Sequence, residues 1–160
     1  MGSGKSTVGR RLAKKLNYDF FDTDRMIEER FNLPEYEVFH KYGSDLFHQT
    51  EVEVLKYLFT LDNVVISCGG ELPYYHDNIA LLNQFGETIW IKMSSKSLAI
   101  RLFSARKKRA QIQDHLSNIE QLEAFVIDQL SQYNLCFSKA RHVIKGENLQ
   151  IDELMQLIEH

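Results

Sequence analysis

The chain has 160 residues, of which 44% are hydrophobic and 11% aromatic, enough to pack the core of one domain and to argue against disorder. Nineteen basic residues against 22 acidic ones give a net charge of −3, which removes the overall electrostatic case for nucleic acid as the main partner. No apolar run approaches the roughly 18 residues of a membrane span, and no secretory pattern is visible. We therefore expect a single domain over residues 1–160 that binds neither nucleic acid nor membrane.

The cysteine content points to a reducing compartment. Cys68 and Cys136 have no metal-ligand spacing and are too few for a disulfide framework. We expect two reduced thiols in a cytoplasmic protein, which we also expect to be a monomer.

Helical and β-branched segments alternate along the chain. Helical patterns cover residues 8–16, 25–31, 44–61, 77–85, 95–106, 119–137 and 151–159, and the first of these segments is amphipathic. Strand-like runs cover residues 18–22, 63–68, 87–93 and 141–144. Such a series favours an α/β fold in which a parallel sheet is covered by helices on both faces.

The strongest motif is the sequence GSGKST at residues 2–7, the second half of a phosphate-binding P-loop. Its glycines let backbone N–H groups wrap a phosphate, and the positive end of the following helix adds to the attraction. The Lys5 ammonium is expected to reach the β- and γ-phosphates, and the Ser6 hydroxyl to ligate Mg²⁺. The alternative is a Gly/Ser-rich start that only caps a helix. The predicted nucleotide-binding residues of this turn are Gly2, Ser3, Gly4, Lys5, Ser6 and Thr7.

The strand that normally feeds such a loop is absent from the given sequence, as is the first glycine of the motif. In this architecture the strand lies in mid-sheet, and without it two strands keep unpaired backbone groups. Either the chain is part of a longer one or the sheet is disrupted, and the sequence leaves both open.

Two further motifs follow at characteristic spacings: FDTD at residues 21–24 and VISCGG at residues 65–70. Together with the P-loop they resemble the shikimate kinase family, small P-loop kinases of the nucleoside monophosphate kinase class, over nearly the whole chain. The resemblance implies a P-loop NTPase fold with a lid at residues 107–118. It also implies transfer of the γ-phosphoryl of ATP, with Mg²⁺, to a hydroxyl of shikimate, a small-molecule acceptor.

The resemblance assigns roles to individual positions. Asp22 matches the carboxylate near Mg²⁺, and Asp24 matches the carboxylate that orients the acceptor hydroxyl. Two carboxylates that lie two residues apart at the end of a strand can serve one metal ion and one hydroxyl. The alternative for both is a helix cap. Arg109 matches the lid arginine that contacts the transferred phosphoryl group, and Arg101 matches the residue that stacks on adenine.

The acceptor side departs from the family pattern. Gly69 and Gly70 match the turn that brings backbone N–H groups near the substrate, and the alternative is an ordinary turn that ends the strand. The glycine that follows them in the family is replaced here by Glu71. The two arginines that bind the shikimate carboxylate are replaced by His48 and Tyr133. Losing two such contacts costs on the order of 3–6 kcal/mol.

All three replacements disfavour an anionic ligand, although a protonated His48 could still hold a carboxylate. The alternative for His48 is a polar surface residue. Two other functions stay open: a kinase of this fold for a neutral or cationic acceptor, and a nucleotide-binding module without turnover. The predicted acceptor-binding residues are Asp24, His48, Gly69, Gly70, Glu71 and Tyr133.

Overall fold

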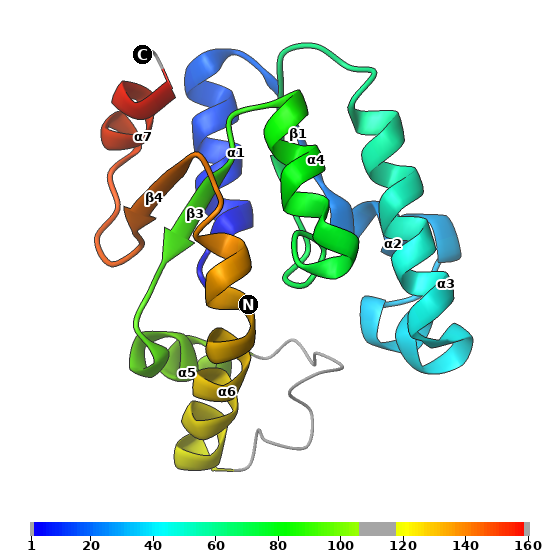
Figure 1. Ribbon diagram of the computed structural model, residues 1–160, viewed down its shortest axis with the longest axis vertical. Coiled ribbons are helices and arrows are strands. Elements are labelled where there is room, and N and C mark those ends of the chain that lie inside the picture. The colour runs from blue at the N-terminus through cyan, green and yellow to red at the C-terminus, as the bar shows by residue number, and fades with distance from the viewer. Residues whose placement is uncertain (1, 106–117, 159–160) are drawn as a thin grey trace.

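The computed structural model describes residues 2–105 and 118–158, in which helices and strands alternate (Figure 1). The helices are α1 (Lys5–Leu16), α2 (Thr23–Phe31), α3 (Glu35–Leu58), the 3₁₀ helix η1 (Tyr75–Asp77), α4 (Asn78–Phe85), α5 (Ser95–Ser104), α6 (Ile119–Phe137) and α7 (Ile151–Ile158). The strands are β1 (Asp19–Asp22), β2 (Val64–Ser67), β3 (Ile89–Lys92) and β4 (His142–Lys145).

The strands of the described chain form two parallel pairs, β1 with β2 and β3 with β4. The first pair runs from Asp19 opposite Val64 to Asp22 opposite Ser67. The prediction of parallel strands is confirmed, and within the described residues the strands form two separate pairs, as expected for a sheet without its mid-sheet strand. None of these residues forms a strand that bridges the two pairs, so each pair keeps open edges.

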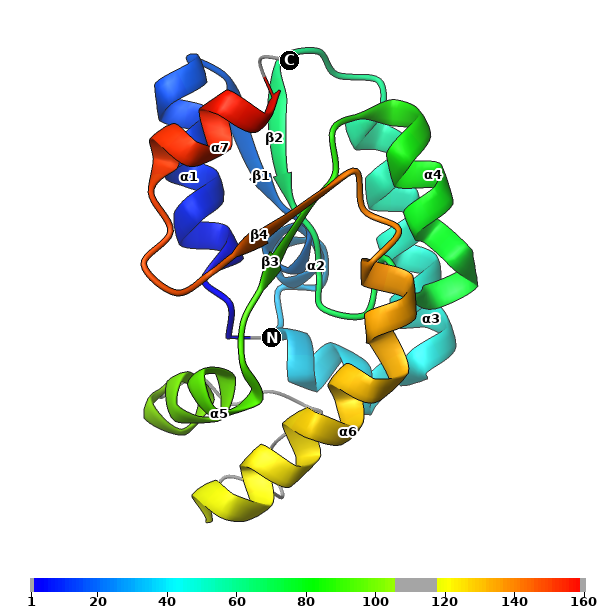
Figure 2. The same cartoon turned by 60° about the vertical axis from the view of Figure 1, so that its left-hand side comes forward.

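Helices lie on both faces of the strands, as predicted (Figure 2). Neighbouring residues of β2 point to opposite faces, as the twofold repeat of a strand requires. Val65 packs with Leu12 of α1 and Leu154 of α7, whereas Ile66 packs with the core between α2 and α3. Ile144 of β4 joins the same cluster as Val65, so one apolar core connects both strand pairs.

Helix α3 begins well before the helix predicted from the sequence. It breaks at Gly43, where the backbone has a φ of 83° inside an otherwise helical run. This left-handed conformation suits glycine, which has no Cβ to clash. The prediction over residues 44–61 found the second part of α3 and missed the part before Gly43.

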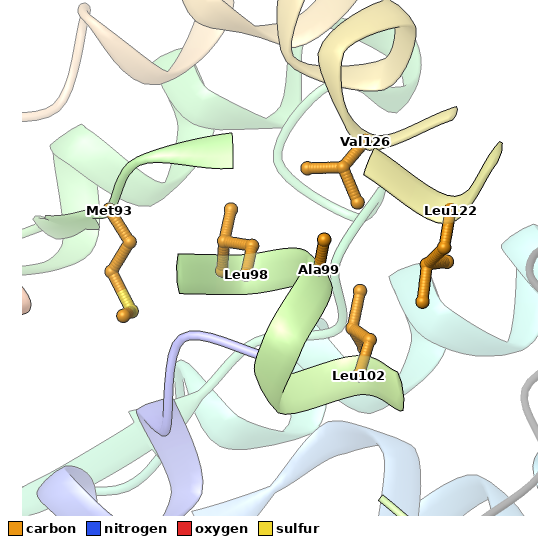
Figure 3. Close-up of a cluster of buried hydrophobic side chains, with 6 residues drawn as sticks. All are labelled: Met93, Leu98, Ala99, Leu102, Leu122 and Val126. Atoms are coloured by element: carbon orange, nitrogen blue, oxygen red, sulfur yellow. The ribbon is translucent and has the colours of Figure 1, made fainter. Parts of the chain in front are cut away.

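Helices α5 and α6 pack together beside the phosphate loop (Figure 3). Leu98 and Leu102 of α5 meet Leu122 and Val126 of α6 in a buried cluster. Of the predicted lid at residues 107–118, the structure describes only Asn118, whose side chain caps the start of α6. No helix among the described residues is long and apolar enough to cross a membrane.

Candidate active site

The phosphate loop has the backbone that its glycines predict. Gly2 and Gly4 have φ values of 67° and 84°, in the left-handed region. A Cβ on Gly2 would lie 3.1 Å from Cγ of Leu102, so α5 closes tightly against the loop. Helix α1 begins directly after Gly4 with no side-chain cap. Its first N–H groups therefore lack a side-chain partner at the position where an anion is favoured.

The rest of the loop lies as predicted around this helix start. Ser3 and Lys5 are partly exposed, and Thr7 is exposed. The guanidinium of Arg101, on α5, donates from Nη1 to the carbonyl of Ser3 at 3.2 Å. Arg101 therefore lies beside the phosphate loop. Its stacking on adenine stays a prediction.

Asp22 links the end of β1 to the phosphate loop. Its Oδ2 accepts a hydrogen bond from the Ser6 hydroxyl at 2.5 Å, and its Oδ1 accepts from the backbone N–H of Asp24 at 3.1 Å. Asp22 therefore caps α2, as the alternative interpretation predicted, and it also contacts Ser6. Its place near Mg²⁺ stays a prediction. Ser67 places its hydroxyl 3.2 Å from that of Ser6, which the sequence analysis missed. The register of Asp22 opposite Ser67 across the strand pair explains their meeting.

Asp24 contacts the lysine of the phosphate loop. Its Oδ2 accepts from Lys5 Nζ at 3.4 Å, whereas its Oδ1 is buried without a hydrogen-bond partner. A buried carboxylate oxygen without a partner is costly, and it is the kind of atom that a ligand hydroxyl satisfies. Residue 24 thus has the position and the free oxygen that orienting an acceptor hydroxyl requires.

The turn after β2 brings the backbone against these carboxylates. The N–H of Gly69 donates to the Thr23 hydroxyl at 2.8 Å, which anchors the turn to the start of α2. A Cβ on Gly69 would lie 2.6 Å from Asp24 Oδ1 and 2.9 Å from Glu51 Oε1. A side chain at this position would force one or both carboxylates to shift, which glycine avoids. The partly buried Gly70 follows it. The structural role of Thr23 was not predicted, although it lies inside the FDTD motif.

His48 is buried, so its interpretation as a polar surface residue is wrong. Its side chain is 6% exposed, and Nδ1 lies 2.7 Å from Oε2 of Glu51, which is 3% exposed. The ring stacks on Tyr75 with centroids 3.7 Å apart. Burial raises the pKa of Glu51, His48 opposes that rise, and the carboxylates of Asp24 and Glu71 add to it.

Glu71 and Tyr133 also form a pair. The Tyr133 hydroxyl donates to Glu71 Oε1 at 3.0 Å, and the ring meets Tyr74 edge-on with centroids 4.7 Å apart. Burial, followed by the Glu71 carboxylate, raises the pKa of Tyr133, so its hydroxyl remains a donor at neutral pH. Two of the three positions that depart from the family pattern thus contact each other.

The structure therefore gathers most of the predicted site residues at one end of β1 and β2. Arg109 lies outside the described residues. Sequence reasoning did not predict the contacts that Glu51 and Tyr75 make with His48. Among the described residues, no group of three or more histidine, cysteine or carboxylate side chains could hold a metal alone. A metal here would need the Ser6 hydroxyl, Asp22 and phosphate oxygens.

Comparison with known proteins agrees with this geometry. A family model described as shikimate kinase matches residues 1–159. The chain is 33% identical to a shikimate kinase of Bacteroides thetaiotaomicron over 150 residues, 94% of this chain and 85% of that protein. It is 31% identical to one of Phocaeicola vulgatus, with the same coverage of both proteins.

Solved structures give the same result. A crystal structure of shikimate kinase from B. thetaiotaomicron superposes with a TM-score of 0.92 at 31% identity, covering 100% of this chain and 94% of that one. Shikimate kinase from Acinetobacter baumannii in complex with shikimate superposes with a TM-score of 0.84 at 26% identity, covering 99% and 88%. These comparisons indicate a phosphotransferase with a P-loop α/β fold that phosphorylates shikimate with ATP. The chain therefore belongs to the shikimate kinase family.

Proposed function

We propose that this chain transfers the γ-phosphoryl of ATP to a hydroxyl of shikimate, using the site at the ends of β1 and β2. The observation that carries the proposal is the contact of Asp24 with Lys5, next to a buried Asp24 oxygen without a partner. This contact supports the proposal, because a carboxylate suited to an acceptor hydroxyl lies beside a lysine suited to a phosphoryl group. Phosphoryl transfer depends chiefly on such positioning and charge stabilisation.

The phosphate loop binds the nucleotide in this proposal. Backbone N–H groups of residues 2–7 surround the phosphates, and the Lys5 ammonium offsets the charge that develops on the transferred group. Arg101 stacks on the base from its place beside Ser3. Arg109 adds a second positive charge at the phosphoryl group, and residues 107–118 form the lid that excludes water.

Mg²⁺ fits the oxygen atoms gathered at Ser6. The ion prefers hard oxygen ligands and usually binds through one or two protein groups together with substrate phosphates. The hydroxyl of Ser6 and the carboxylate of Asp22, already in contact, are such a set. When bound, the ion neutralises phosphate charge, and Asp22 also fixes the start of α2 through the N–H of Asp24.

Asp24 holds the acceptor. Its free Oδ1 accepts the hydrogen bond of the attacking hydroxyl and is placed to take that proton during transfer. The turn at Gly69 and Gly70 brings the acceptor-side backbone close to the same carboxylate. Two unpaired thiols support a cytoplasmic location.

A second candidate is the same reaction on an acceptor without a carboxylate. It is favoured by one observation: Tyr133, at a position where the family has an arginine, donates its hydroxyl to a glutamate. A third possibility, nucleotide binding without turnover, is separated from both by the experiment below.

The experiment is a coupled assay of ADP release with Mg²⁺ and ATP, with and without shikimate, on the wild type and Asp24→Asn. We expect shikimate-dependent release that Asp24→Asn reduces by about 10²–10⁴-fold, the usual contribution of a positioned acid or base. The exposed Asp62→Asn is the matched control and should keep wild-type turnover. ATP binding with no turnover on any acceptor would refute the proposal.

A further inference from the structure

His48 and Glu51 form a buried pair on one face of α3. Nδ1 of His48 lies 2.7 Å from Oε2 of Glu51, and the two side chains are 6% and 3% exposed. The imidazole ring stacks on Tyr75 and meets Phe47 edge-on. A carboxylate at one ring nitrogen fixes the orientation of an imidazole and assigns any ligand contact to the other nitrogen. Nε2 is therefore the atom through which His48 can contact a ligand.

The His48–Glu51 pair belongs to the acceptor side of the site. A Cβ on Gly69 would lie 2.6 Å from Asp24 Oδ1 and 2.9 Å from Glu51 Oε1, so both carboxylates lie against the same turn. Glu51 thus has one oxygen beside Asp24 and its other oxygen on the His48 ring. The pair stands next to the carboxylate whose buried oxygen lacks a partner and suits an acceptor hydroxyl.

The backbone that carries Tyr75 has an unfavourable conformation. The next two residues, His76 and Asp77, have φ values of 50° and 55°, in the left-handed region that residues other than glycine rarely adopt. The ring of His76 meets Tyr75 edge-on, and Asp77 is held by Lys139 at 3.0 Å. Strain of this kind persists where the surroundings hold it, often at functional sites. Here it accompanies the aromatic ring that covers His48.

The protonation of the pair responds to neighbouring carboxylates. Burial raises the pKa of Glu51, His48 opposes that rise, and the carboxylates of Asp24 and Glu71 add to it. A carboxylate on an acceptor placed beside the pair would act in the same direction as Asp24 and Glu71. By linkage, a ligand that makes the pair hold a proton more strongly itself binds more strongly when that proton is present.

Other titratable groups reach this cluster from α1, the turn after β2 and α6 in the described part of the chain. Lys5 of α1 contacts Asp24 at 3.4 Å. Burial raises the pKa of Cys68 to about 12. Burial, followed by the Glu71 carboxylate, raises the pKa of Tyr133. Cys68 and Tyr133 therefore keep their protons at neutral pH and do not take up another.

We propose that His48 and Glu51 form the subsite for the carboxylate of the acceptor, and that shikimate binding takes up one proton at this pair. The proton comes from solvent and charges the imidazole, which donates from Nε2 to the ligand while Nδ1–H stays on Glu51. An arginine is charged at every accessible pH, whereas an imidazole is charged only when it has bound a proton. Acceptor affinity therefore falls as the pH rises. This inference rests on the proposed function, because it assumes that the acceptor binds beside Asp24.

The test is calorimetric titration of the protein with shikimate and with its uncharged methyl ester, in the presence of a non-hydrolysable ATP analogue. Each titration is made in HEPES and in Tris at the same pH. Because these buffers release protons with different enthalpies, the difference in binding enthalpy gives the number of protons taken up. Repeating it between about pH 6 and pH 8, where an imidazole ordinarily changes charge, gives the pH dependence of Kd.

The variants separate the donor from the proton. His48→Gln keeps an N–H donor near the place of Nε2 but cannot gain a proton, and His48→Arg is charged throughout. The matched control is His40→Gln, at an exposed histidine on the same helix.

We expect the wild type to take up as much as one proton with shikimate and none with the methyl ester. Its Kd for shikimate should rise by up to about tenfold per pH unit, the limit for one linked proton, and its Kd for the ester by less than about twofold. His48→Gln should bind shikimate about 10–10²-fold more weakly at about pH 6, without proton uptake, because a charged hydrogen bond is lost. His48→Arg should bind shikimate without proton uptake, and His40→Gln should behave as the wild type.

The inference is overturned if shikimate binds without proton uptake, if the ester takes up the same proton, if His48→Gln retains the uptake, or if shikimate does not bind. The comparison of shikimate with its ester needs only the wild type, so it decides the question even where a variant at the buried position fails to fold. Failure of the proposed function looks different. Shikimate would then bind together with its proton, but the coupled assay would detect no ADP release.

Discussion

Replacing Gly69 by alanine tests whether the turn after β2 is built around the two site carboxylates. The new Cβ would lie 2.6 Å from Asp24 Oδ1 and 2.9 Å from Glu51 Oε1, well inside normal contact distance. Both carboxylate residues are buried, at 6% and 3% exposure, so neither oxygen can move freely into solvent. Overpacking of this kind costs about 1–3 kcal/mol, which for a chain of this length lowers Tm by on the order of 2–12 °C.

The assay is thermal unfolding together with acceptor-dependent ADP release. Gly86→Ala is the matched control, because no atom lies within 4 Å of its added Cβ and its backbone is extended. That variant should keep the wild-type Tm or gain slightly. Gly69→Ala should lower Tm and reduce turnover, because Asp24 must move. The reasoning is refuted if Gly69→Ala matches Gly86→Ala in both Tm and turnover.

Three other predictions follow from the same site. Lys5→Ala should abolish acceptor-dependent ADP release while the far-UV spectrum stays that of the wild type, and turnover above about a tenth of wild type would contradict the role of Lys5. Burial raises the pKa of Glu51 above 4.5, so the folded state binds its proton more strongly. The free energy of unfolding should therefore fall as the pH rises from about 4.5 through the raised pKa, and urea unfolding should show that Glu51→Gln lacks this fall. If the wild type instead became more stable relative to Glu51→Gln over that pH range, the result would oppose the prediction. Burial raises the pKa of Cys68 to about 12, so iodoacetamide at about pH 8 should label it far more slowly in the native protein than in urea, and equal rates would be evidence against this environment.

Local patterns predicted most elements because their signals lie within a few residues of each other. The helix predicted over residues 119–137 matches α6. The start of α3 was missed because Gly43 interrupts its periodicity. The separation of the strands into two pairs agrees with the absence of the mid-sheet strand from the given sequence. Which strands pair depends on contacts between distant segments, which periodicity does not contain.

In the candidate site, too, some contacts could be predicted from local motifs and others depend on distant segments of the chain. The contact of Lys5 with Asp24 follows from two motifs whose spacing is characteristic of the family. The stacking of Tyr75 on the His48 ring could not be predicted, because Tyr75 belongs to η1, which lies far from α3 in the sequence. The hydrogen bond between Tyr133 and Glu71 joins residues 62 positions apart, and no local pattern links them.

The central claim is that this chain places a phosphoryl group of ATP on an acceptor hydroxyl. Mass spectrometry of shikimate and of its methyl ester after incubation with ATP and Mg²⁺ tests it most directly, with Asp24→Asn as the control. The account predicts an acceptor that carries one added phosphoryl group with the wild type and almost none with the variant. ADP formed without any phosphorylated acceptor, or equal product from both proteins, would contradict it.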